Sequence, residues 1–147
     1  MPLILFSTFK YVIPAVAIHF ANIIPQSAIE VASDHSLYSL DKTVLSPSQL
    51  EDTVQEAYLS SWYQKMKLLV NTDQQYQIEF RQSKFFGANA FALPNGTIVI
   101  TDDLVNLFKD NQDALFTIVL HEIGHVEHQH SMRYIAESLA TSIVVNY

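Results

Sequence analysis

The sequence contains no cysteine among its 147 residues. Disulfide bonds and thiolate metal sites are therefore both excluded, and a metal ion would have to bind histidine, aspartate or glutamate. Basic residues are also scarce, with 8 Lys and Arg against 15 Asp and Glu. They are scattered from Lys10 to Arg133 without a cluster, so nucleic-acid binding is disfavoured.

Charged residues of both signs make up only 16% of the chain, whereas 49% is hydrophobic and 12% aromatic. Such a chain is too apolar and too aromatic to be disordered, and its length suits one domain with a real core. The mean hydropathy of +0.13 is high for a freely soluble domain. Contact with a membrane therefore enters as a hypothesis.

One long apolar run covers residues 3–24 and has about the length of a membrane-spanning helix. Lys10 and Pro14 interrupt it, and no basic leader or small-residue cleavage pattern marks it as a cleaved signal. Three interpretations stay open: a membrane anchor, an apolar helix docked on the protein, and an export signal. We predict an anchor-like segment over residues 1–24 and an irregular linker over residues 25–46.

A helix is predicted over residues 47–70. Ser46 would be its N-cap, Pro47 its first residue and Gln49 part of a capping box. Apolar residues then recur at helical spacing, namely Leu50, Val54, Tyr58, Trp62, Met66 and Leu69.

A small antiparallel sheet is predicted to follow. Residues 75–81 alternate polar and apolar side chains, and two further apolar runs cover residues 89–93 and 97–101. Asn95-Gly96 between these runs supplies the positive φ angles of a tight hairpin. Helix caps are predicted at Thr101 and at residues 110–113, ahead of the helix with the chemical motif.

The motif is His121-Glu122-Ile123-Gly124-His125. In a helix the two histidines lie about 40° apart around the axis and one turn apart along it, so that both can bind one ion. Zinc bound in this way with an open position lowers the pKa of water from about 15.7 to near 7. Glu122 can accept the proton of that water without binding the metal, which is the chemistry of peptide-bond hydrolysis. His128 lies too far along the axis to join them.

The stretch from Asn89 to Arg133 resembles the HtpX- and CAAX-prenyl-protease-like family of gluzincin metallopeptidases, the Oma and Ste group. Two segments carry the resemblance, namely residues 89–101 and the helix around His121-Glu122-Ile123-Gly124-His125. The resemblance implies one Zn²⁺ per chain bound by His121 and His125, with Glu122 as general base. It also implies that the strand edge at Asn89, Ala90 and Phe91 binds a peptide or protein substrate by strand addition; ordinary sheet core is the alternative for these three residues.

Members of that family take a third zinc ligand from a glutamate on a later helix, whereas this sequence ends at Tyr147. We therefore expect a metallopeptidase domain over residues 47–147 that stops before the third ligand. The predicted fold class is α+β, with a zincin-like core, a small antiparallel sheet, and apolar helices at both ends. The predicted function is that of a zinc metalloendopeptidase at a membrane, of the bacterial inner-membrane kind. The alternative is an inactive remnant that binds peptides or a membrane.

Overall fold

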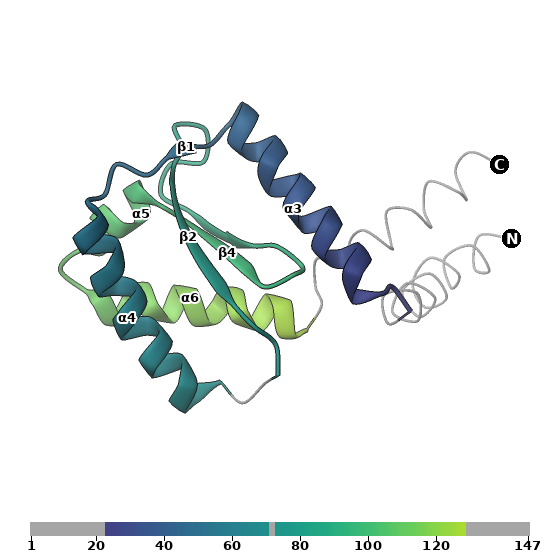
Figure 1. The fold of residues 1–147 in the computed structure, drawn as a ribbon. Coiled ribbons are helices and arrows are strands. Elements are labelled where there is room, and N and C mark those ends of the chain that lie inside the picture. The colour runs from purple at the N-terminus through teal and green to yellow at the C-terminus, as the bar shows by residue number, and fades with distance from the viewer. Residues whose placement is uncertain (1–22, 71–72, 129–147) are drawn as a thin grey trace, which may run out of the picture.

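The computed structural model describes residues 23–70 and 73–128. Within these residues the fold is a mixture of helices around a four-stranded sheet (Figure 1). The helices are α3 (Gln26–Thr43), α4 (Asp52–Leu69), α5 (Asp102–Leu107) and α6 (Gln112–Glu127). The strands are β1 (Ser46–Pro47), β2 (Gln77–Gln82), β3 (Ala90–Ala92) and β4 (Thr97–Thr101). The α+β class is as predicted.

The sheet has the strand order β1-β2-β4-β3, and β3 lies at one edge. β3 and β4 form the predicted antiparallel hairpin, in which Gly96 has a φ of 92°. β2, however, pairs with β4 in parallel, so the prediction of an antiparallel sheet was wrong. Alternating side chains show which face of a strand is buried but not in which direction the strand runs beside its neighbour.

One face of the sheet forms the main core. Ile78 and Phe80 of β2 and Ile98 and Ile100 of β4 point to this face, against α4, α5 and α6. Trp62 of α4, with a 1% exposed side chain, lies within aromatic contact distance of Phe80, with ring centroids 5.9 Å apart. Burying side chains of this size contributes about 1.5–3 kcal/mol each, so this layer holds α6 firmly against the sheet.

The opposite face is covered by α3, which occupies most of the segment predicted to be an irregular linker. That prediction of irregular structure was wrong. Ser33 is the only fully buried residue of α3, and Ile29, Leu37 and Leu40 are partly buried on the same side, so the apolar stripe is sparse and interrupted by a serine. Polar contacts also attach the helix. Asp41 forms an ion pair with Arg81 of β2 at 2.9 Å, and the Ser33 hydroxyl accepts a hydrogen bond from the backbone N–H of Asn95 at 3.1 Å.

The helix predicted from residue 47 begins five residues later, at Asp52. Ser46 and Pro47 instead pair with β2 as the short strand β1. The Ser48 hydroxyl donates a hydrogen bond to the Asp102 carboxylate at 2.6 Å, and the Gln49 backbone N–H donates to the same carboxylate at 2.7 Å. A contact made across 54 positions of sequence therefore replaces the predicted capping box.

The apolar segments predicted at both ends fall almost wholly on residues 1–22 and 129–147, outside the described part of the chain. Among the residues that are described, no helix combines the length and the apolar composition that crossing a membrane requires. The division of the chain into anchor, linker and peptidase domain stays a prediction.

Candidate metal centre

α6 carries the candidate site, and its own sequence fixes where it begins. The side chain of Asn111 caps the helix by accepting a hydrogen bond from the backbone N–H of Ala114 at 3.1 Å, within the region predicted to be a cap. Residues four apart then face the core, and the buried set is Leu115, Phe116, Val119 and Ile123. His121, Glu122 and His125 lie on the flank of this buried face.

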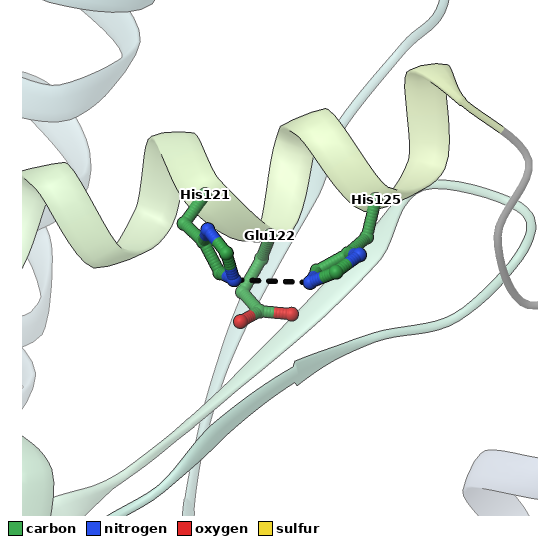
Figure 2. A group of neighbouring side chains, drawn as sticks. All are labelled: His121, Glu122 and His125. Carbon is green, nitrogen blue, oxygen red and sulfur yellow. Dashed lines mark hydrogen bonds between the residues drawn. The ribbon is translucent and has the colours of Figure 1, made fainter.

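The structure brings His121, Glu122 and His125 together (Figure 2). One potential ligand atom from each residue lies within 4.8 Å of the others. The Nε2 atoms of the two histidines are 3.0 Å apart, and their rings stand nearly perpendicular, at 86°. Within residues 23–70 and 73–128, no other group of three histidine or acidic residues is arranged to hold a metal ion. His128 is the C-cap of α6 and is not part of the group.

The spacing of the two histidines can be compared with what zinc requires. Two nitrogens at roughly 2.0–2.1 Å from a tetrahedral ion are about 3.3 Å apart. The observed 3.0 Å between the Nε2 atoms of His121 and His125 is only a few tenths of an ångström shorter. Neutral imidazole is also a preferred zinc ligand. The two side chains therefore fit a zinc ion with a small rotation of either ring.

Glu122 differs from the histidines in its surroundings because it is turned toward the sheet edge. Its carboxylate accepts a hydrogen bond from the backbone N–H of Ala92 in β3. Burial raises the pKa of Glu122 above its ordinary value, whereas His125, His121 and the Ala92 N–H act in the opposite direction. A carboxyl group whose proton affinity is raised in this way is suited to accept a proton and release it again.

β3 is the neighbour of this site, and no strand in the described part of the chain pairs with its outer edge. The backbone N–H of Leu93 and the backbone C=O of Asn89 both hydrogen-bond to β4. By the alternation of an antiparallel pair, the N–H and C=O groups of Ala90 and Ala92 must point away from β4. The side chain of Asn89 accepts from the Ala90 N–H at 2.9 Å, and Glu122 accepts from the Ala92 N–H. The outer edge of β3 thus faces the candidate metal centre directly.

A further contact holds the C-terminal end of α6. The hydroxyl of Tyr76, just before β2, donates a hydrogen bond to the carboxylate of Glu127, the last residue of α6. Burial, together with the hydrogen bond and charge of Glu127, raises the pKa of Tyr76 above its ordinary value. The helix turn that carries His125 is therefore attached to the sheet, 51 residues away in sequence.

The residues predicted from the sequence lie on α6 and at the neighbouring edge of the sheet. His121, Glu122 and His125 form one cluster, and Asn89, Ala90 and Phe91 lie at the sheet edge beside it. Sequence reasoning missed Ala92, whose N–H contacts Glu122. The alternation of residues 89–93 groups Ala90 with Ala92, but only the strand order shows that their backbone groups face an open edge.

Two histidines and a glutamate on one helix, beside the free edge of a sheet, define a class of metal-binding hydrolytic sites. The particular family follows from comparison with known proteins. The model of peptidase family M48 matches residues 48–147, more than half of the chain. The chain therefore belongs to peptidase family M48, whose members are metallopeptidases, typically zinc-dependent. No curated protein and no solved structure matches it.

Proposed function

We propose that this chain is a zinc metalloendopeptidase of the HtpX- and CAAX-prenyl-protease-like group. The observation that carries the proposal is the cluster of His121, Glu122 and His125 beside the open edge of β3, in a chain of family M48. His121 and His125 would hold the ion. Zinc, when bound, would polarise the substrate carbonyl and lower the pKa of a water molecule.

Glu122 is proposed as the general base. Its carboxylate would accept a proton from the attacking water as the new C–O bond forms, and would give that proton to the amine as the C–N bond breaks. The contact with Ala92 supports this role, because it aims the carboxylate at the edge where a substrate would lie. A peptide is proposed to add to β3 beside Asn89, Ala90 and Phe91, with hydrogen bonds to the outward C=O groups of Ala90 and Ala92, whose N–H groups already bind Asn89 and Glu122.

The first test is zinc content of the purified full chain, measured by elemental analysis together with cleavage of a peptide mixture. We expect close to one zinc per chain, lost in His121→Ala and kept in His35→Ala, a control histidine exposed on α3. Glu122→Gln should keep its zinc and lose about 10²- to 10⁴-fold in kcat. Full activity of Glu122→Gln, or equal zinc in wild type and His121→Ala, would refute the proposal.

A second candidate is a peptide-binding module without turnover. It is favoured by one observation: the described residues offer only two histidines and the proposed base at the site. Zinc binding and peptide binding without cleavage, in a chain that includes residues 129–147, would select this candidate over the enzyme.

The location at a membrane is a separate part of the proposal. It is supported by the apolar run over residues 3–24 in the sequence. We expect the full chain to sediment with membranes after washing in alkaline carbonate, and a form starting at residue 25 to remain in the supernatant. Equal distribution of the two forms would contradict the proposed location at a membrane. It would not contradict the proposed peptidase activity.

A further inference from the structure

Three phenylalanine rings form a continuous contact beside β3. The ring centroids of Phe86 and Phe91 are 5.6 Å apart, and those of Phe85 and Phe86 are 5.1 Å apart in an edge-to-face arrangement. Phe85 is 74% exposed, and the other two rings are partly exposed. Exposing a large apolar ring to water is unfavourable, so contact with a further apolar group would stabilise this cluster.

The pairing of the strands defines which face of the sheet the cluster lies on. Ala90 and Ala92 pack against the main core beneath α6. Phe91, between them, must therefore point to the opposite face, in one row with Val99 of β4. The backbone N–H and C=O groups of Phe91 point toward Val99 of β4. A residue opposite Phe91 in an added strand would therefore form a non-hydrogen-bonded pair with Phe91. Side chains approach most closely in such pairs.

The side chains of a substrate strand added to β3 would therefore point alternately to the two faces of the sheet. The residues opposite Ala90 and Ala92 would donate hydrogen bonds to the outward C=O groups of these two residues and would turn their side chains toward the face of α6. The residue opposite Phe91 would turn its side chain to the phenylalanine face, where it meets Phe91 first and Phe86 behind it. The side chain at one position of the substrate would therefore contact aromatic rings.

We propose that Phe91, Phe86 and Phe85 form a specificity subsite that selects an apolar, preferentially aromatic, side chain at the one substrate residue paired with Phe91. This inference rests on the proposed function, because it assumes that the substrate adds to the edge of β3. An aromatic side chain would stack on the exposed ring surface, whereas a charged one would lose hydration against the rings. The chemical class of substrate is then an extended peptide with a large apolar residue at a fixed distance from the cleaved bond.

The test is cleavage of an unbiased mixture of synthetic peptides by the zinc-loaded full chain, with the products sequenced by mass spectrometry. We expect enrichment of Phe, Tyr, Leu and Met at one position. Phe86→Ala should reduce that enrichment about two- to tenfold, the range for loss of one aromatic contact, and should leave the preferences at other positions unchanged. Phe85→Ala should reduce it less, because the Phe85 ring is 74% exposed, and its removal should leave folding unchanged.

Leu107→Ala is the matched control, because Leu107 is 66% exposed but lies on α5, away from β3. Melting curves would confirm that all three variants are folded. Preferences that are identical in wild type, Phe86→Ala and Phe85→Ala would overturn the subsite. A preference for acidic residues at that position, which neighbouring Lys84 would favour, would overturn it as well.

A second measurement separates this inference from the proposed function. The same peptide mixture is passed over the immobilised Glu122→Gln chain, with and without Phe86→Ala, and the bound peptides are sequenced. Enrichment of apolar residues at one position that Phe86→Ala abolishes would support the subsite even if the wild-type chain cleaves nothing. Absence of enrichment would refute the subsite, whereas cleavage by the wild type would still support the peptidase.

Discussion

Asp102 is predicted to be the polar residue on which the folded state depends most. Its side chain is 5% exposed and accepts hydrogen bonds from the Ser48 hydroxyl at 2.6 Å and the Gln49 backbone N–H at 2.7 Å. These two bonds hold the segment that precedes α4 against the start of α5. Hydrogen bonds to a charged group contribute about 1.5–3 kcal/mol each. Asp102→Ala should therefore lower the free energy of unfolding by about 3–6 kcal/mol.

Asp102→Asn should cost less, about 1–2 kcal/mol, because the amide keeps one oxygen as an acceptor and loses only the charge and the second acceptor. Asp103→Ala is the matched control: it removes the neighbouring acidic residue from the same first turn of α5, but Asp103 is exposed. Its loss should cost only the interaction of a charge with the helix N-terminus, about 0.3–1 kcal/mol.

The measurement is urea denaturation followed by tryptophan fluorescence, since Trp62 lies in the core. An excess of EDTA removes any contribution of metal binding to the stability. The reasoning would be refuted if Asp102→Ala and Asp103→Ala lowered the free energy of unfolding equally, because the two buried hydrogen bonds would then contribute nothing beyond the helix-end charge.

Three further predictions concern stability. Gly96→Ala should destabilise the protein by at least about 1–2 kcal/mol, because the residue has a φ of 92° and its added Cβ would lie 2.4 Å from the backbone oxygen of Gln75; an unchanged urea midpoint would contradict this. Gly124→Ala should stabilise it by about 0.5–1 kcal/mol, since a Cβ on that helical residue meets nothing within 4 Å; a lower midpoint than that of the wild type would show the opposite. Tyr76 has a raised pKa in the folded state, so its contribution is complete below the pKa of an unfolded tyrosine, near 10, and is lost as the pH rises through the folded pKa. Tyr76→Phe should flatten the alkaline fall in stability, and Tyr38→Phe, at an exposed tyrosine, should not.

Features that depend on neighbouring residues could be predicted from the sequence. Asn95-Gly96 determines its own turn because few other residues adopt the required φ angles, and the hairpin of β3 and β4 follows from it. The caps at Thr101 and Asn111 also form within three residues. The approach of His121 to His125 follows from the helical repeat alone, which is why the cluster was predictable before the fold was known.

Features that depend on distant residues could not be predicted in this way. Ser48 has the chemistry of a helix cap, and it also binds Asp102, a partner that the sequence does not reveal. The direction of β2 beside β4 depends on how the intervening chain crosses the sheet. α3 has only a sparse apolar stripe, and the contacts of Asp41 and Ser33 that help to attach it involve residues that are distant in sequence. The contact of Glu122 with Ala92 likewise exists only once the helix and the strand are packed together.

The hydrogen bond between Glu122 and the Ala92 N–H also has a consequence for the colloidal behaviour of the protein. Strand edges with unpaired backbone groups tend to pair with the edges of other molecules and so lead to aggregation. Glu122 places a charged side chain across this edge, and Asn89 covers the neighbouring N–H of Ala90. Removing the carboxylate by Glu122→Ala would open the edge to self-association, whereas Glu122→Gln retains an oxygen that can still cover it. The residue proposed to take the proton in catalysis thus also protects the outer edge of β3 against pairing with other copies of the chain.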